Sequence, residues 1–180
     1  LFEIRMKKNI AFVIGHLSHG GAEKQIYLLS KGLNKSRFNS IVICLSKTGY
    51  PWGDRIMEEG IPIIYMNRVS RFDLTRLFRL TWLFYKFNID IIVSSLHIAN
   101  VYSWLARLFY FRRSRYLAQV RSKESLMSSM IKWLNISALN SADLVITNSK
   151  MLNSFVTEFF KQDNRKIVTI NNGIEIKESR

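Results

Sequence analysis

The fold follows from one segment, IAFVIGHLSHGGAEKQIYLLSKGL (residues 10–33). Its first five residues are all apolar, which is typical of a strand buried on both faces of a parallel sheet. Apolar side chains then recur at the spacing of an amphipathic helix, at Ile26, Leu29 and Leu33. A helix that begins at Gly20 and Gly21 directs its free N–H groups beyond the carboxyl edge of the sheet, where a phosphate or a sugar can approach the backbone.

Two familiar phosphate-binding loops do not fit this segment. A P-loop needs Lys and then Ser or Thr after its last glycine, but Gly21 and Ala22 occupy these positions. The dinucleotide fingerprint needs an acidic residue after the second strand, and the apolar run 40–45 leads instead into Ser46 and Lys47. We therefore do not expect NAD or ATP as the ligand. A second interpretation, that the glycines only form a tight turn, stays open at this point.

The composition indicates one globular domain in a reducing, cytoplasmic setting. The chain has 180 residues, 48% of them hydrophobic, which is enough for a substantial core. Its single cysteine, Cys44, lies in an apolar run and is expected to be a buried, inert thiol. The N-terminus lacks the layout of a signal peptide, and Met6 is expected to be the start, preceded by five extra residues, 1–5.

Apolar runs alternate with helical stretches along the whole chain. The predicted strands lie at 10–14, 40–45, 61–66, 89–94, 115–120, 144–147 and 167–170. Helical stretches of roughly 10 to 16 residues separate them. This order predicts an α/β fold with a doubly wound, Rossmann-like parallel sheet, in which ligands bind beyond the carboxyl ends of the strands.

Four segments at these strand ends resemble glycosyltransferase family 4: GGAEKQIYLLSKGL, IDIIVSSLHIANVYSWLARL, SADLVITNSKMLNSF and VTINNGIE. The resemblance extends over almost the whole chain. Enzymes of this family have the two-domain GT-B fold, in which the N-terminal half mainly binds the acceptor and the C-terminal half holds most of the donor. The resemblance therefore implies an N-terminal half, with an acceptor-binding domain over 6–171, the start of the interdomain linker over 172–180, and the C-terminal donor domain absent.

The function that the resemblance implies is a retaining, hexosyltransferase-like enzyme that moves a sugar from a nucleotide diphosphate sugar to an acceptor hydroxyl, without a metal or other cofactor. The implied acceptor is a sugar or a lipid-linked precursor of a surface polysaccharide, lipopolysaccharide or glycan. A helix N-terminus contributes about 0.3–1 kcal/mol to phosphate binding, or about 2 kcal/mol when buried. Micromolar binding needs roughly 8 kcal/mol. The donor must therefore be shared with the missing domain, and the chain alone is expected to be inactive.

The resemblance and the strand ends together indicate the candidate site residues. Gly20 and Gly21 form the expected donor-phosphate loop, whose N–H groups stabilise the leaving diphosphate. His97 and Arg121 are the candidate catalytic residues. His97 follows the fourth strand, where relatives often carry a histidine that faces the acceptor or the reacting sugar; alternatively, it caps the helix that begins near Ile98. Arg121 stands where several relatives carry a histidine, and we expect it to bind a phosphate or an acidic acceptor group.

Further candidates for the acceptor or sugar cleft are Glu23, His19 and Asn148. Glu23 either turns outward and stabilises the helix dipole or accepts hydrogen bonds from sugar hydroxyls. His19 is otherwise a surface residue, and Asn148 with Ser149 otherwise forms the N-cap of the next helix. Asn172 and Gly173 predict a hinge at the domain boundary. No metal site is expected, because the loop histidines have no carboxylate cluster nearby.

A net charge of +14 indicates an acidic partner. Basic and aromatic residues gather in 68–87 and 110–123. On a helix over 74–87, apolar side chains cover well over half of the circumference and leave Arg76, Arg79 and Lys86 on the rest. Part of this face is expected to meet an anionic membrane, which would place the protein on the inner face of the cytoplasmic membrane. The alternative is a helix buried between the sheet and its neighbours.

Two other classes of function were compared with this one. Nucleic-acid binding is not expected, because zinc spacing, an RNP-like motif and a recognition helix are missing and the basic residues do not form one stripe. A noncatalytic, membrane-docked interaction subunit that partners a separate donor-binding protein remains the alternative.

Overall fold

The computed structural model describes residues 7–67, 73–122, 128–159 and 166–175. The strands within these residues are β1 (Lys8–Ile14), β2 (Phe38–Cys44), β3 (Ile63–Tyr65), β4 (Ile91–Ser95), β5 (Arg115–Val120), β6 (Leu144–Thr147) and β7 (Ile167–Thr169). The helices are α1 (Gly21–Gly32), α2 (Trp52–Glu58), α3 (Leu74–Lys86), α4 (His97–Leu108), α5 (Ser129–Asn140) and α6 (Lys150–Phe159). Every predicted strand is present. The predictions for residues 1–5 and Met6 lie outside the described residues.

All strands pair in parallel in one sheet with the order β3-β2-β1-β4-β5-β6-β7. The predicted fold class, a doubly wound α/β fold, is therefore confirmed. The chain reverses its direction of winding between β1 and β4, where Ile14 lies opposite Ser95 at the carboxyl ends. In such sheets, this switch point leaves a crevice for a ligand between the loops that follow the two strands.

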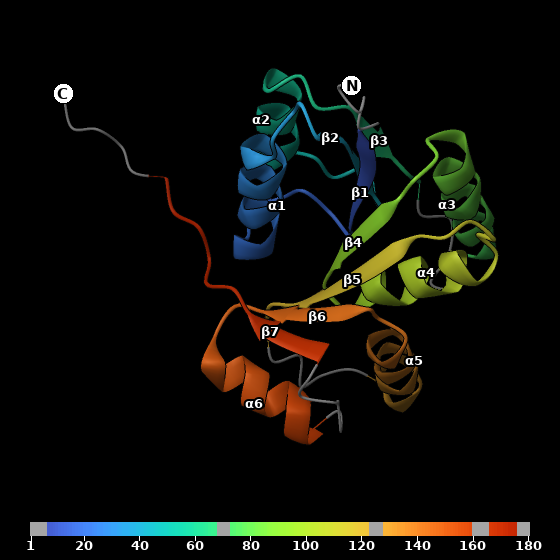
Figure 1. Cartoon of the computed structure of the whole chain (residues 1–180), viewed down its shortest axis with the longest axis vertical. Helices are drawn as coiled ribbons and strands as arrows, with labels where there is room; N and C mark the ends of the chain where they lie inside the picture. Colours follow the sequence, from blue (N-terminus) through green and yellow to red (C-terminus); the bar gives the residue numbers. More distant parts are fainter. Residues whose placement is uncertain (1–6, 68–72, 123–127, 160–165, 176–180) are drawn as a thin grey trace, which may run out of the picture.

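Helices cover both faces of the sheet, with α1 and α2 on one face and α3, α4 and α5 on the other (Figure 1). Alternate residues of β1 contribute to the two cores. Ala11 and Val13 pack in the core that includes α3 and α4, whereas Phe12 and Ile14 pack with Ile26 of α1. Burial on both faces explains why β1 reads as a continuous apolar run. Cys44 is also buried as expected, and burial raises the pKa of its thiol.

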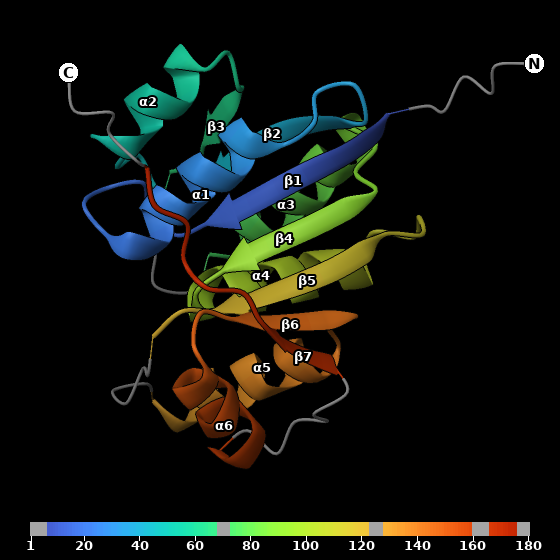
Figure 2. The same cartoon turned by 60° about the vertical axis from the view of Figure 1, so that its left-hand side comes forward.

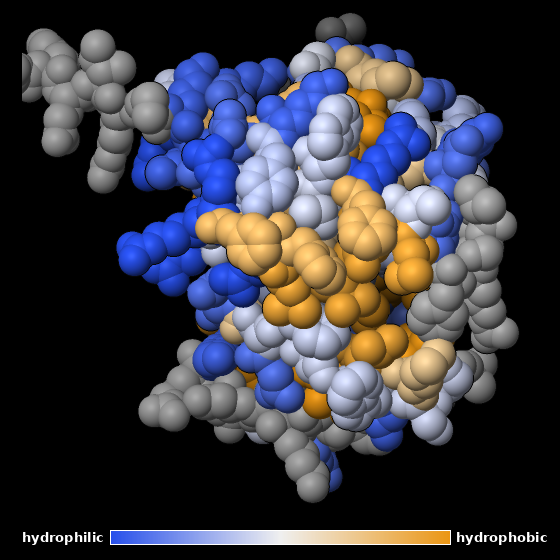
Figure 3. Space-filling model, turned by 90° about the vertical axis from the view of Figure 1, so that its right-hand side faces the viewer, coloured by the Kyte–Doolittle hydropathy of each residue, from blue (hydrophilic) through white to orange (hydrophobic). Residues whose placement is uncertain are grey.

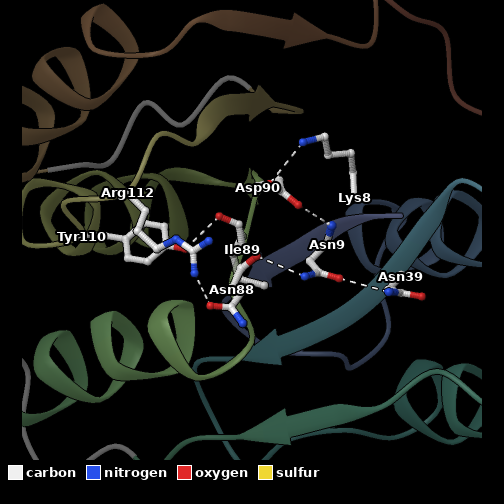
Figure 4. A network of polar contacts seen from close by, with 8 residues as sticks. All are labelled: Lys8, Asn9, Asn39, Asn88, Ile89, Asp90, Tyr110 and Arg112. Atoms are coloured by element: carbon white, nitrogen blue, oxygen red, sulfur yellow. Dashed lines mark hydrogen bonds and ion pairs between the residues drawn. The ribbon is translucent and has the colours of Figure 1, made fainter. Parts of the chain in front are cut away.

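A polar network joins the amino ends of the strands, at the edge opposite the candidate site (Figure 4). The carboxylate of Asp90 accepts a hydrogen bond from the backbone N–H of Asn9 (2.9 Å) and lies 3.5 Å from the ammonium of Lys8. The amide of Asn9 donates to the carbonyl of Asn88 and accepts from Asn39, both at 3.1 Å. These contacts tie together the amino ends of β1, β2 and β4.

Helix α3 was predicted correctly in its extent, but its orientation differs from the expectation. Arg76, expected on the polar side, is 6% exposed, whereas the apolar residues Phe78 and Trp82 are 60% and 55% exposed. Arg76 belongs to the buried face because it stands one and two helical turns before Leu80 and Leu83, which pack in the core. The alternative of a helix buried between the sheet and its neighbours is also wrong for the face that carries Phe78 and Trp82.

Within the described parts of the chain, we find no helix with both the length and the apolar character needed to cross a bilayer.

Candidate functional site

The candidate site lies at the carboxyl edge of the sheet. The loops that follow β1, β4, β5 and β6 all reach this edge because the strands are parallel. The segment 170–175 runs from β7 across the same edge toward α1 (Figure 2). The predicted site residues are therefore gathered on one side of the domain, together with the predicted hinge.

The two glycines of the first loop differ in their surroundings. Helix α1 begins at Gly21, and Gly20 is its N-cap, with an extended φ of 174° that any residue adopts. A Cβ at Gly20 would lie 2.1 Å from Oε2 of Glu23, whereas a Cβ at Gly21 would meet nothing within 4 Å. A side chain at Gly20 would therefore displace the carboxylate of Glu23, whereas one at Gly21 would not.

Glu23 turns back over this loop and is only 3% exposed. Its Oε1 lies 3.2 Å from Nδ1 of His16, and the hydroxyl of Ser18 lies 2.8 Å from the same nitrogen. The expectation that Glu23 turns outward is therefore wrong. A buried carboxylate in the first turn stabilises the helix dipole but repels a close anion, so it is better suited to accept hydrogen bonds from sugar hydroxyls. His19 is exposed, and its ring packs edge to face against that of Tyr50 at 6.1 Å.

His97 is the first residue of α4, after β4. The N-cap is Leu96, so the capping role considered for His97 is wrong. Leu96 has φ 72° and ψ 159°, a conformation that costs a residue with a side chain about 1–3 kcal/mol and is found most often at functional sites. Half-burial of the imidazole lowers the pKa of His97 below its ordinary value of 6.5. The ring is therefore neutral at pH 7 and can accept or donate a hydrogen bond there.

The burial of His97 predicts a pH-dependent contribution to stability. Because the native pKa lies below 6.5, the unfolded state binds the proton more readily, and this term is lost as the pH falls below about 6.5. Above pH 6.5 the term is constant. Urea unfolding of the parent chain and the His97→Gln variant between pH 5 and 8 should therefore give a difference in unfolding free energy that shifts in favour of the variant below about pH 6.5. Parallel curves across this range would contradict the assignment.

Arg121 lies at the centre of a chain of polar contacts. Its Nε donates to Oε1 of Gln119 (3.0 Å), which also accepts from the hydroxyl of Ser95 (2.7 Å). Its Nη1 donates to Oδ1 of Asn172 (2.8 Å), and the side-chain amide of Asn148 donates to its carbonyl (3.3 Å). Burial lowers the pKa of Arg121 to about 10, so the guanidinium stays charged at neutral pH. Three predicted residues, Arg121, Asn148 and Asn172, are thus brought together.

The cap of α6 is Ser149, whose hydroxyl accepts the N–H of Leu152 at 3.2 Å. Asn148 is consequently not needed as the cap that we considered, because its side-chain amide is directed to the carbonyl of Arg121 instead.

The predicted hinge is held against α1 by a residue that sequence reasoning missed. The side chain of Gln25 donates to the carbonyl of Gly173 (2.9 Å) and accepts from its N–H (2.8 Å), across 148 residues of sequence. The hydroxyl of Tyr27 donates to Glu175 at 3.3 Å. Ser95 and Gln119 were missed as well. Only Gln119 gave a signal in the sequence, as a polar residue inside the apolar run of β5.

A cavity of about 460 Å³ lies beside this edge, between the loops after β1 and β2 and the helices α3, α4 and α5. Its polar lining comes from the two loops and the first turn of α3: His16, Ser18, Ser46, Thr48, Asp73 and Arg76. Its apolar lining comes from the helices and includes Leu77, Ile98, Val101, Leu105 and Leu134. Across the described residues, no group of three or more His, Cys, Asp and Glu side chains is placed to hold a metal ion.

Solved structures with the same fold include HepE from Anabaena in complex with UDP, with a TM-score of 0.74 and 18% identity over 94% of this chain and 45% of that chain. A glycosyltransferase from Rickettsia africae gives a TM-score of 0.74 and 20% identity over 93% of this chain and 44% of that chain. The lipopolysaccharide outer core galactosyltransferase WaaB gives a TM-score of 0.73 and 15% identity over 94% of this chain and 47% of that chain. The chain thus spans about half the length of these proteins. The comparison with curated proteins finds no match.

The family model described as Glycosyltransferase Family 4 matches residues 19–178, which is most of the chain. The matched region includes the glycine loop, the β4–α4 turn with His97, and the segment that carries Asn172 and Gly173. The likeness to the solved glycosyltransferases agrees with the fold that this match implies. The chain belongs to Glycosyltransferase Family 4.

Proposed function

We propose that this chain is the acceptor-side half of a retaining glycosyltransferase, which transfers a sugar from a nucleotide diphosphate sugar to an acceptor hydroxyl. One observation carries the proposal. The loops after three neighbouring strands, β1, β4 and β5, present Gly20, His97 and Arg121 at one edge of the sheet. HepE, which shares the fold, binds UDP and UDP-glucose, and this supports a nucleotide sugar as the donor.

Each of these groups has a role that its surroundings favour. The N–H groups at the start of α1 stabilise negative charge on the leaving diphosphate, because they are fixed in place before the reaction. The neutral imidazole of His97 accepts a hydrogen bond from a sugar or acceptor hydroxyl. The carboxylate of Glu23 accepts hydrogen bonds from hydroxyls, and the cationic Arg121 attracts a phosphate or acidic group.

A second, donor-binding half completes this site in the proposal. The contacts available at the glycine loop supply only about 2 kcal/mol at most toward phosphate binding, far below the roughly 8 kcal/mol of a micromolar complex. We propose that residues 6–171 form the acceptor domain and that 172–180 begin the linker to the other half. The clamps of Arg121 on Asn172 and of Gln25 on Gly173 fix the direction in which this linker leaves the domain.

The test is to read the gene beyond the codon for residue 180 and to express the encoded protein, which we call the extended polypeptide. Radiolabelled UDP-sugars and a membrane lipid extract serve as donor and acceptor, and NMR gives the anomeric configuration of the product. Transfer with retention by the extended polypeptide supports the proposal. A stop codon at this point would instead favour the noncatalytic interaction subunit that partners a separate donor-binding protein.

We also propose that the acceptor is lipid-linked and that the domain docks on an anionic membrane, where such an acceptor resides. The support is an exposed apolar surface, here called the aromatic patch, on α3 and the end of α4 (Figure 3). It consists of Leu74, Phe78, Trp82, Tyr85, Leu108, Phe109 and Phe111, all of them exposed. The rings of Phe78 and Phe109, 6.2 Å apart, connect the two helices.

Basic side chains border this patch. The ammonium of Lys86 lies 4.8 Å from the ring centre of Trp82, and Arg79, Arg112 and Arg113 are exposed on the same elements or next to them. Together with the net charge of +14, these basic residues are suited to binding anionic lipid head groups. Each basic residue near the membrane surface contributes about 1 kcal/mol to binding. A hydrophobic patch with a basic border is the arrangement that interfacial membrane binding requires.

Replacement of both Phe78 and Trp82 by serine is expected to lower binding to phosphatidylglycerol vesicles at least about tenfold, because each buried aromatic ring contributes roughly 1.5–3 kcal/mol. Vesicle pelleting of the 180-residue chain measures this. The control is Met57→Ser, which replaces an exposed apolar residue of α2 on the other face of the sheet, and this variant should bind like the parent. Unchanged binding of the double variant would argue against docking through the patch.

A further inference from the structure

The cavity beside the sheet edge encloses the cationic side chain of Arg76, which pairs with none of the Asp and Glu side chains that the structure describes. Arg76 is 6% exposed and lines the cavity from the first turn of α3. Its Nε and Nη2 are buried and have no hydrogen-bond partner within the part of the chain that the structure describes. A buried guanidinium with unsatisfied N–H groups destabilises a fold unless a ligand or another group satisfies them. Packing alone therefore does not explain why an arginine is buried at position 76.

The described neighbours of Arg76 hold its side chain in position but do not neutralise its charge. The guanidinium carbon lies 5.3 Å from the ring centre of Tyr102 on α4, a cation–π contact that holds the side chain over the cavity lining. The nearby carboxylate of Asp73 is used at the start of α3, where its Oδ1 accepts the N–H groups of Thr75 (3.1 Å) and Arg76 (3.3 Å). The structure shows no ion pair between Arg76 and a described Asp or Glu.

We propose that Arg76 binds an oxyanion, a phosphate or carboxylate, that belongs to an amphiphilic ligand seated in this cavity. A guanidinium presents paired N–H donors that match the two oxygens of such a group, and the apolar helix surfaces around it receive an apolar chain. Leu74 connects the two regions, since it lines the cavity and is also 68% exposed within the aromatic patch. The identification of this ligand as the acceptor rests on the proposed function; the binding of an oxyanion by Arg76 does not.

The probe is n-octyl phosphate below its micelle-forming concentration, titrated into the 180-residue chain by calorimetry. Arg76→Gln should weaken its binding about tenfold or more, as expected for the loss of a charge-assisted hydrogen bond in a dry site. The control Arg55→Gln removes the same charge at an exposed position of α2, on the other face of the sheet, and should leave affinity within about twofold of the parent. Octanoate in place of octyl phosphate shows whether a carboxylate serves as well.

Two further ligands test the anion-binding part and the apolar part of the site one at a time. Inorganic phosphate, which has no chain, and n-octyl glucoside, which has no charge, should both bind more weakly than octyl phosphate, and only the former should depend on Arg76. Thermal unfolding gives the check on folding. Arg76→Gln should unfold at a temperature no lower than the parent, because it removes an unsatisfied buried charge. If this variant does not fold, Arg76→Lys, which keeps the charge but loses the paired donors, should still show weaker octyl phosphate binding.

Equal affinity of the parent and Arg76→Gln for octyl phosphate would overturn the inference. None of these measurements uses a donor sugar, so their result is independent of the transferase assay. Binding that depends on Arg76, without sugar transfer by the extended polypeptide, would leave the anion site in place and remove only its role as the acceptor site. Transfer without such binding would remove this inference and leave the proposed function.

Discussion

The Gly20→Ala variant of the extended polypeptide should transfer sugar at least about 100-fold more slowly than the parent. The added Cβ would lie 2.1 Å from Oε2 of Glu23, so the buried carboxylate must leave its place beside His16 and move toward the start of α1 or into the site. Alanine keeps the backbone N–H, but a displaced carboxylate repels the diphosphate that the N–H groups bind, and we expect this to cost as much as the loss of one oxyanion donor, a factor of about 10² to 10³ in rate. Steady-state kinetics with a UDP-sugar measure the effect.

Gly21→Ala is the matched control for this prediction. A Cβ at Gly21 meets nothing within 4 Å, and alanine inside a helix is favoured over glycine by up to about 1 kcal/mol. The control should therefore lose much less activity than Gly20→Ala and unfold at the same or a slightly higher temperature than the parent. Equal loss of activity in both variants would show that the contact between Gly20 and Glu23 is not what matters.

The Tyr116→Ala variant should lose about 3–5 kcal/mol of unfolding free energy, which is a large part of the stability of a domain of this size. Tyr116 is fully buried on β5, and its hydroxyl donates to the carbonyl of Asn100 on α4 at 2.9 Å. The hydroxyl of Ser94 on β4 donates to Oδ1 of Asn100 at 2.6 Å and lies 3.3 Å from that of Tyr116. The alanine variant loses a large packed ring and the hydrogen bonds of its hydroxyl.

Urea unfolding of the 180-residue chain tests this prediction. Tyr116→Phe keeps the ring and removes only the hydroxyl, so its loss should be about 1–3 kcal/mol. The network anchors the first turns of α4 to β4 and β5, and with them the position of His97. A loss below about 1 kcal/mol for the alanine variant would mean that this network contributes little to holding α4.

The sequence was sufficient for the fold because the decisive signals are local. Each strand is a short apolar run, and β1 lacks alternation because both of its faces are buried. Helix α3 was recognisable from its period, yet Arg76 was placed on the wrong side. The spacing of Arg76 to Leu80 and Leu83 indicates the buried face. Apolar residues occur on the exposed face of α3 as well, so hydrophobicity alone did not distinguish the two faces.

The candidate site was predictable only where position after a strand decides it. The location of His97, Arg121 and Asn148 at one edge followed in this way, because parallel strands bring their following loops together. Gln25 and Ser95 act through partners far away in sequence, and no local pattern reports a contact such as that between Gln25 and Gly173. The inward turn of Glu23 depends likewise on the loop conformation that brings His16 beside it.

The central claim, that this chain is the acceptor-side half of a retaining glycosyltransferase, is tested most directly by a transfer assay on two proteins side by side. The 180-residue chain and the extended polypeptide are each incubated with radiolabelled UDP-sugars and a membrane lipid extract. The account predicts labelled product only with the extended polypeptide, with the anomeric configuration of the donor retained. Transfer by the 180-residue chain alone, or a product of inverted configuration, would contradict it.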